Sequence, residues 1–561
     1  MEHIQGQAKR IDVLPMVKHY IDALELYPLF QKHIPKPSNS PIEPAQVLCM
    51  MVANIICASK PLYKVEEWLA DYTDGLSEEH INAKLYNDDQ LGRTIDKLFN
   101  VDRHSMMTEL SVNAIKVHNL ETNAIHNDST SVTFCGAYEG NDKNNSDTIH
   151  LTQGFNKDHR PDCKQIVFGL NITEDGHVPL SFQLFDGNTT DDTTHIPNWN
   201  GLRSLLAKED FIYIADCKLS SMENLAYIDG ADGLFITIIP KNRKEVQDFY
   251  QQLEKKDVQW EDAYTSINSR KKGEVIIYKT YEGASSRQGY RIIWVHSSTK
   301  EAQDKSRREH KIEKIIQELK IVETKLNRYS LKTKNQIEAR VKKICAGYRD
   351  FFTIEIIEKK DIETIQAKPG KPGPHTRYIE REKISYHLEW TLNEKAIEKK
   401  SKTDGIYPLI TNTDLPAVDI LKTYKKQPYL EKRMYTTKSI LEVAPVFLKL
   451  PRRIEALMFL YFVALMIVSL MERNIRKNMA MENIKKLAIL PQGMNTKRPT
   501  WNNLNYFFRN VYLSLIVMEG KVIKTTVKGM TVLHYEVARL LEVSLSSYKN
   551  LKDGWWQFET G

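Results

Sequence analysis

The stretch that decides the fold is FIYIADCKLSSMENLAYIDGADGLFITIIP, residues 211–240. Its two ends, FIYIAD (211–216) and LFITIIP (234–240), are short apolar runs rich in β-branched and aromatic residues, which is typical of buried strands. The segment between them, SSMENLAYI (220–228), has a helical pattern. A strand, a helix and a second strand in succession predict part of an α/β domain.

Three further strand-like runs precede this stretch. They are AIHND (124–128), QIVFGLNI (165–172) and VPLSFQLF (178–185), and turn signals follow the second and the third. A helical pattern at 196–206 comes next. Three strands, then helix, strand, helix and strand, is an order that predicts an α/β domain with a mixed sheet.

The remaining chain flanks or interrupts this domain. Residues 1–118 show no strand alternation and are predicted to be helical. Strand-like runs surround a basic segment after residue 257, and a turn-rich loop, KPGKPGPH (368–375), lies among them. Helix returns at Pro416, with Asp414 as a possible cap. The predicted domains are a helical N-terminal region (1–118), the first part of the core (119–257), a β-rich insertion with a basic helical hairpin (258–404), the second part of the core (405–490) and a helical C-terminal region (491–561).

The positive charge of the chain is concentrated in that insertion. The net charge is +7, and residues 300–343 alone carry 14 Lys or Arg against 7 Asp or Glu. Apolar residues at helical spacing in the same segment predict a basic amphipathic helical hairpin, one face packed and the other offering cations. That cationic face is either a solvated surface or a site that neutralises phosphates.

Composition excludes several protein classes. With 41% hydrophobic and 27% charged residues, the chain is neither a polytopic membrane protein, a collagen-like fibre nor a wholly disordered chain. The six cysteines form no CxxC pair, so neither a zinc ribbon nor a disulfide framework is indicated. A reducing, cytoplasmic compartment is the simplest interpretation.

One apolar stretch invites comparison with a membrane span. Residues 456–471, ALMFLYFVALMIVSLM, contain no charge, but a spanning helix needs about 20 residues. Charged residues close both ends of the stretch. It is predicted to be a buried core helix, with no membrane partner.

Two aspartates follow apolar strand runs. Asp128 closes AIHND and Asp216 closes FIYIAD. A carboxylate at such a position is held by a rigid element and is free to bind a hard cation. Each aspartate alone is equally explained as the residue that leads out of a strand into a turn.

A third candidate element lies within TYKKQPYLEKRMYTTKS (423–439). Tyr424, Gln427, Glu431 and Lys438 are spaced +3, +4 and +7, so at roughly 100° per residue they would share one helix face. Such a face is either an ordinary polar surface or one that binds metal and DNA phosphate. Pro428 must kink the helix or start a new one, and in the second case Tyr424 and Gln427 precede the break.

This third element resembles a signature of the DDE transposases of bacterial insertion sequences. The family's Y-x2-R-x3-E-x6-K signature reads here as Tyr424-x2-Gln427-x3-Glu431-x6-Lys438, with glutamine in place of arginine. Other blocks resemble the family in the same order along most of the chain. They are HNDSTSVTFCG (126–136), GFNKDHRPDCKQIVFGL (154–170), DGNTTDDTTH (186–195), YIADCKLSSMENL (213–225) and EKRMYTTKSILEVAPVFLKLPRRIEAL (431–457).

The resemblance implies a ribonuclease H-like core, interrupted by the insertion, in which Asp128, Asp216 and Glu431 are catalytic and bind two divalent ions. Hard oxygen ligands suit Mg²⁺, for which Mn²⁺ should substitute. Two such ions serve both oxygens of an in-line phosphodiester displacement. The implied activity is cut-and-paste transposition: binding of the inverted-repeat ends, metal-dependent cleavage and joining of the 3′-hydroxyl ends to target DNA, often through a hairpin intermediate.

The resemblance also implies DNA contacts and partners. Tyr424 and Lys438 would hold phosphates near the cut, whereas Gln427 can donate a hydrogen bond but no charge. Lys157 and Arg160 are further candidate DNA contacts, each equally explained as part of a polar loop. The expected partners are double-stranded DNA, as terminal repeats and target, and a second copy in a homodimer, with residues 1–118 binding the repeats or mediating dimerisation.

Less specific candidates have simpler explanations. Asn188 and Asp191 could steady the site, but a Gly-Asn turn accounts for them. His126 is more typical of a packed strand histidine than of a ligand. Two rival functions stay open: a ribonuclease H-like nuclease that does not transpose, and a DNA-binding protein descended from a transposase that has lost catalysis.

Overall fold

The computed structural model describes residues 4–38, 40–73, 82–134, 138, 148–154, 160–190, 193–268, 273–442, 448, 450–519, 521–544 and 548. These residues form two compact units. The first comprises Met1–Thr237, Thr411–Asp414 and Lys422–Gly561, and the second comprises Ile238–Ile410 and Leu415–Leu421.

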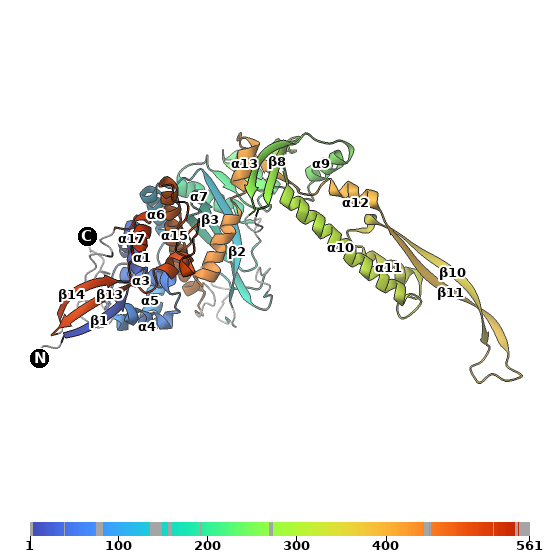
Figure 1. The fold of residues 1–561 in the computed structure, drawn as a ribbon, viewed down its shortest axis with the longest axis horizontal. Coiled ribbons are helices and arrows are strands. Elements are labelled where there is room, and N and C mark those ends of the chain that lie inside the picture. The colour runs from blue at the N-terminus through green and yellow to red at the C-terminus, as the bar shows by residue number, and fades with distance from the viewer. Residues whose placement is uncertain are drawn as a thin grey trace. The chain divides into compact units, whose positions relative to one another are not determined.

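The first unit contains the predicted mixed sheet (Figure 1). Its strands follow the order β4-β3-β2-β5-β6. The β2–β3 and β3–β4 pairs are antiparallel, whereas β2–β5 and β5–β6 are parallel, which confirms the mixed α/β fold. The strand bounds are β2 (Ala124–Phe134), β3 (Lys164–Thr173), β4 (Pro179–Asp186), β5 (Ile212–Ile214) and β6 (Leu234–Ile238).

Helices of the N-terminal region confirm most of the prediction for residues 1–118. They are α1 (Leu14–Ala23), α2 (Leu26–His33), α3 (Pro44–Cys57), α4 (Val65–Thr73), α5 (Asp88–Phe99) and α6 (Arg103–His118). The segment Ile4–Arg10 is instead a strand, β1, so the helical prediction is wrong there. This strand depends on a partner near the other end of the chain, which local sequence does not reveal.

That partner corrects the helical prediction for residues 491–561 as well. The segment β13 (Tyr512–Met518) pairs antiparallel with β1 and with β14 (Lys521–Lys528). Its residues are alternately buried and half-buried, a period of two that favours a strand. Only α16 (Trp501–Phe507) and α17 (Val532–Leu540) are α-helical in the described part of this region.

The core of the first unit is built around α15 (Pro451–Met481). By length and composition alone this helix could cross a membrane. Every residue of its stretch 456–471 is buried in the protein, and the helix packs against α3, α5 and β4. The prediction of a buried core helix is therefore confirmed. The helices α6 and α14 (Pro428–Tyr435) pack against β4 and β2, respectively. The chain also forms α7 (His195–Leu206), α8 (Met222–Gly230) and α13 (Ala417–Tyr424).

One part of the second unit consists of strands and two helices. Strand order is β12-β9-β8-β7, and the last three strands are antiparallel neighbours. The elements are α9 (Lys244–Lys255), β7 (Glu261–Ile267), β8 (Val275–Glu282), β9 (Arg291–Ser297), α12 (Glu394–Ser401) and β12 (Ile406–Thr411). The predicted insertion, 258–404, lies wholly within this unit.

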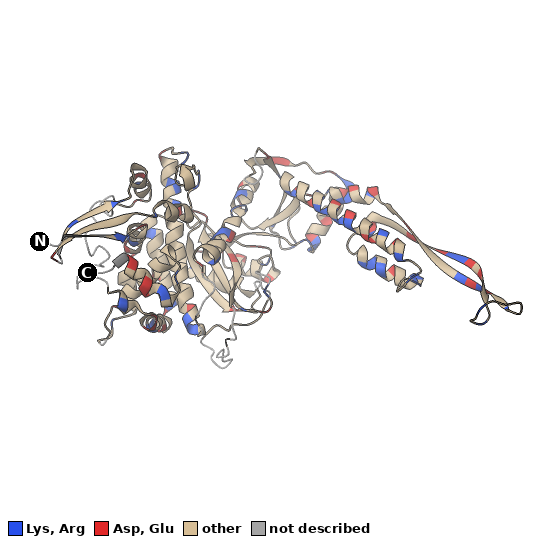
Figure 2. Ribbon diagram, turned by 60° about the horizontal axis from the view of Figure 1, so that its bottom comes forward, with Lys and Arg blue, Asp and Glu red and all other residues tan. Residues whose placement is uncertain are grey.

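The predicted basic hairpin is present in the second unit as α10 (Ser298–Lys325) and α11 (Lys334–Ile344). Its apolar stripe packs on one end of a two-stranded ribbon made of β10 (Phe352–Gln366) and β11 (Tyr378–Leu392). The turn-rich loop at 368–375 joins these two strands. Figure 2 shows acidic residues interspersed with basic ones along the helices of the second unit.

Candidate functional site

Asp128 and Asp216 lie at equivalent positions relative to two neighbouring parallel strands, Asp128 within β2 and Asp216 just beyond the end of β5. The last paired residues of β2 and β5 are His126 and Ile214. Each aspartate lies two residues further along its strand direction, so the same register places both at one edge, where β5 ends. Both residues are half-buried.

The position of Asp128 differs from the prediction in one respect. It does not close its strand, because β2 continues to Phe134 and pairs Asp128 with Leu170 of β3. β-branched residues in the polar run after Asp128 continue the hairpin with β3. Asp128 is therefore held by strand pairing with β3, beyond the point where β5 has ended.

Local backbone contacts orient both carboxylates. The backbone N–H of Ser129 donates to Asp128 Oδ1 at 2.8 Å, and that of Lys218 donates to Asp216 Oδ1 at 2.9 Å. The Thr237 hydroxyl on β6 donates to the Asp216 carbonyl at 2.6 Å. These bonds fix one oxygen of each carboxylate and tie the chain after β5 to the next strand.

The phenol of Tyr424 interacts electrostatically with both aspartates. Burial raises the pKa of its phenol, and the negative charges of Asp216, Cys217 and Asp128 raise it further. The phenol therefore lies within electrostatic reach of both carboxylates and stays protonated at neutral pH. A protonated phenol beside two carboxylates can donate a hydrogen bond to an anionic oxygen.

Gln427 fastens the next helix to β2 beside Asp128. Its Nε2 donates to the carbonyl of Asn127 at 2.8 Å, so its Oε1 faces the other way, 2.8 Å from His126 Nδ1. His126 must donate in that contact, because an amide oxygen only accepts. Both the nitrogen and the oxygen of the Gln427 amide are thus hydrogen-bonded to residues of β2.

His126 is the packed strand histidine that its sequence context indicates. It is fully buried, and burial lowers its pKa to about 4, although the bond to Gln427 acts in the opposite direction. The imidazole is neutral at pH 7. Its Nε2 has no hydrogen-bond partner among the described residues.

Pro428 starts a new helix, which is the second of the two alternatives for this segment. Tyr424 ends α13, Gln427 is the N-cap of α14, and Pro428 is its first residue. The four signature residues therefore do not share one continuous helix face. Lys438 lies further on, in a π-helical turn (Thr436–Ile440), and is half-buried.

Glu431 lies on α14 one turn after Gln427, with an exposed side chain. Residues four apart share a helix face, so Glu431 is on the face that Gln427 fastens to β2. Within the described ranges, no three His, Cys, Asp or Glu side chains are close enough together to hold a metal ion. The structure thus brings together Asp128, Asp216 and Tyr424, but not Glu431 as a third ligand.

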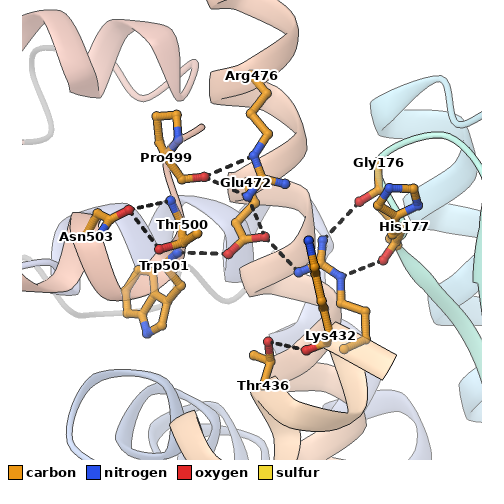
Figure 3. Close-up of polar contacts among 12 residues, drawn as sticks. Gly176, His177, Lys432, Thr436, Glu472, Arg476, Pro499, Thr500, Trp501 and Asn503 are labelled. Atoms are coloured by element: carbon orange, nitrogen blue, oxygen red, sulfur yellow. Dashed lines mark hydrogen bonds and ion pairs between the residues drawn. The ribbon is translucent and has the colours of Figure 1, made fainter. Parts of the chain in front are cut away.

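A buried ion-pair network behind α14 was not predicted from the sequence (Figure 3). Arg433 donates to Glu472 of α15 at 2.8 Å and to the carbonyls of Gly176 and His177 at 3.0 and 2.8 Å. Burial alone would raise the pKa of Glu472, but Arg433 and Arg476 hold it below its usual value. The network joins α14, α15 and the β3–β4 turn. No local pattern in the sequence predicts it, because its members come from distant segments of the chain.

A second unpredicted network lies on the other face of β2. Asn127 Nδ2 donates to Asn171 Oδ1 on β3 at 2.9 Å, and the amides of Asn171 and Asn198 bond each other at 2.7 and 2.8 Å. Asn198 also donates to the Tyr213 hydroxyl on β5 at 2.8 Å. The sequence offers one sign of this network, namely the asparagines inside the apolar runs 124–128 and 165–172. A buried amide needs hydrogen-bond partners, so these asparagines indicate that partners lie nearby.

The remaining predicted contacts lie further from this group or outside the described part of the chain. Arg160 is exposed, and its guanidinium donates to both oxygens of Asp162 at 2.9 and 2.8 Å. Asn188 is exposed in the turn after β4. Lys157 and Asp191 lie outside the described residues.

Comparisons with known proteins match two segments of the chain. Residues 6–112 match a family described as Domain of unknown function (DUF4277). Residues 121–348 match a family described as Transposase DDE domain, a segment that includes Asp128 and Asp216 but ends before Glu431. This second match supports a DDE transposase.

Whole-chain comparisons add little. No curated protein matches the chain. A cryo-EM structure of the piggyBac transposase synaptic complex with hairpin DNA is 8% identical, with a TM-score of 0.38 over 90% of this chain and 82% of that chain. A likeness at that TM-score carries no argument about fold or function.

Proposed function

We propose that this protein is a DNA transposase that binds the inverted-repeat ends of a bacterial insertion sequence, cleaves them and joins their 3′-hydroxyl ends to target DNA. One observation carries the proposal: Asp128 on β2 and Asp216 just beyond β5 each lie two residues past the last parallel pair of these strands, within the segment that matches the Transposase DDE domain. In this proposal the mixed sheet is a ribonuclease H-like core, and the second unit holds its insertion. The protein would act on DNA in the bacterial cytoplasm as a homodimer.

The two aspartates fit a site for divalent metal. Both offer carboxylate oxygens, which Mg²⁺ prefers, and each has one oxygen oriented by a backbone N–H. When bound, two such ions activate the attacking oxygen and stabilise the leaving oxygen. Asp128 and Asp216 would hold them, and Mn²⁺ would substitute.

Glu431 is the proposed third ligand. Its helix is fastened through Gln427 to β2, the strand that bears Asp128, and Glu431 lies one turn after Gln427 on the same helix face. Tyr424 and Lys438 would hold phosphates beside the cut, as in the Y-R-E-K signature. The protonated Tyr424 phenol is suited to donate to a phosphate oxygen near the two carboxylates.

Substitution of the three carboxylates tests the proposal. The substrate is duplex DNA that carries the sequences flanking the gene, and the measurement is Mg²⁺-dependent strand cleavage beside DNA binding. We expect Asp128→Ala, Asp216→Ala and Glu431→Ala each to abolish cleavage while binding survives. Asp210→Ala, an exposed aspartate just before β5, is the matched control and should cleave normally.

Different results would select the rivals. Cleavage that survives Glu431→Ala would remove Glu431 from the site, with Glu442 and Glu455 as the next candidates. Binding without cleavage by the unaltered protein would favour a DNA-binding protein that has lost catalysis. Cleavage without joining to target DNA would favour a ribonuclease H-like nuclease that does not transpose.

A further inference from the structure

Two cations converge on one aromatic ring close to the proposed site. Lys432 Nζ lies 4.7 Å from the centroid of the Tyr429 ring, and Arg498 Cζ lies 4.4 Å from it. Arg498 also donates to the Tyr429 hydroxyl at 2.8 Å. His177 stacks on the same ring, with centroids 4.1 Å apart. We call Tyr429, Lys432 and Arg498 the cation clamp.

The clamp has an excess of positive charge. Both of its cations are exposed, and neither has a carboxylate partner in the described part of the chain. The nearby Glu472 is already bound by Arg433 and Arg476. Burial together with the surrounding arginines lowers the pKa of His177 to about 2, so the histidine adds no charge of its own.

The clamp is held by rigid parts of the first unit. Arg476, on the buried helix α15, donates to the Pro499 carbonyl at 3.0 and 2.6 Å and so fixes the residue after Arg498. Lys432 is next to Arg433, which the same Glu472 anchors. Figure 3 shows Lys432, His177, Arg476 and Pro499 around this network.

Like charges held near one ring repel each other, and the ring only partly offsets this. An anion would offset it fully, and a guanidinium with a neighbouring ammonium suits a phosphate. Lys432 directly follows Glu431. We therefore propose that Lys432 and Arg498 bind a phosphate of the DNA backbone on the clamp, an inference that rests on the proposed function and deepens it.

The salt dependence of DNA binding tests this inference. The probe is a 30-base-pair duplex of arbitrary sequence, and affinity is measured over a series of KCl concentrations. We expect Lys432→Gln/Arg498→Gln to reduce the slope of log affinity against log salt by about 1, which corresponds to one lost phosphate contact. Affinity at low salt should fall roughly tenfold.

Two control variants separate the loss of phosphate binding at the clamp from a general loss of charge and from a loss of folding. Lys255→Gln/Lys256→Gln removes the same charge from exposed lysines at the end of α9 and should leave the slope unchanged. Lys432→Arg/Arg498→Lys keeps both charges and should keep the slope, which separates lost charge from lost folding. An unchanged slope in the double Gln variant would overturn the inference.

The outcomes separate this inference from the proposed function. If cleavage requires Asp128 and Asp216 but the double Gln variant binds DNA with an unaltered slope, the clamp assignment alone fails. If the unaltered protein binds no duplex DNA, both fail. Calorimetric binding of inorganic phosphate that the double variant loses, with no change in the DNA slope, would mean a free-anion site and overturn the assignment to DNA.

Discussion

His126 and Gln427 are hydrogen-bonded through Nδ1 and Oε1, which lie 2.8 Å apart. The pair joins the strand that bears Asp128 to the helix that bears Glu431. The family signature has an arginine where this chain has Gln427. Because both ends of the Gln427 amide are bound to β2, the glutamine here acts as a structural tie, and its predicted contact with DNA would have to use the second N–H of Nε2.

Removing the tie should loosen α14. Gln427→Ala deletes two hydrogen bonds to β2 and leaves His126 Nδ1 buried without an acceptor. At about 1 kcal/mol for each bond, the free energy of unfolding should fall by roughly 2 kcal/mol, as measured by urea denaturation. Gln251→Ala, an exposed glutamine on α9, should change it by less than about 0.5 kcal/mol. Equal losses in the two variants would contradict the tie.

The buried histidine should make stability depend on pH. The pKa of His126 is about 4 in the folded protein and near 6.5 when unfolded, so between these values only the unfolded chain binds the proton. Stability therefore falls as the pH drops from 6.5 toward 4, by up to about 1.4 kcal/mol per pH unit from this residue.

His126→Gln should make that dependence shallower, since a glutamine does not titrate. Other histidines whose pKa values burial lowers would contribute to the slope that remains: His19, His118, His177 and His534. His310→Gln, at an exposed position on α10, is the control. Urea denaturation at several pH values measures the effect, and identical pH profiles for the His126 variant and the unaltered protein would refute it.

The buried Arg433–Glu472 pair should be costly to break. Arg433→Met leaves Glu472 in the core with one fewer cation and frees two backbone carbonyls, so we expect a loss of about 3–5 kcal/mol in unfolding free energy. The exposed pair of Arg93 and Asp89 provides the contrast: Arg93→Met should cost less than about 1 kcal/mol. Thermal and urea unfolding of both variants would reveal whether burial makes this difference.

Substitutions in the basic hairpin test whether its cationic face is a solvated surface or a phosphate-binding one. Lys314, Lys320, Lys342 and Lys343 are exposed on α10 and α11. Changing all four to Gln should flatten the salt dependence of DNA binding if they neutralise phosphates. The matched control changes Lys359, Lys360, Arg381 and Lys383 of the ribbon, three of which pair with ribbon carboxylates. If both sets alter the slope equally, the hairpin has no special role.

Sequence patterns predicted the sheet because each strand is itself an apolar run. The apolar stripe of residues 300–343 likewise predicted α10 and α11. In these cases a short stretch of residues contains most of the information that its structure needs. The parallel register of β2 and β5 aligns Asp128 with Asp216, and it was not predicted, because β3, β4 and α7 lie between these two strands in the sequence.

Features that depend on distant partners were missed. The strand β1 exists because β13 lies beside it, about 500 residues along the chain. The local sequence around Arg433 is that of an ordinary helix. Only the folded structure shows that Glu472 and two backbone carbonyls surround its guanidinium. Where Glu431 lies relative to the aspartates depends on the angle of α14 after Pro428, and residue spacing cannot give that angle.

The pairing of β1 with β13 also bears on how the protein is made. A ribosome synthesises β1 about 500 residues before β13, the strand that completes its hydrogen bonds. Until residues 512–518 have been added, the edge of β1 that binds β13 is unpaired, and α15 lacks α16 and α17, which later pack against it. A nascent chain of this kind exposes strand edge and apolar surface for a long time, which makes it a substrate for chaperones.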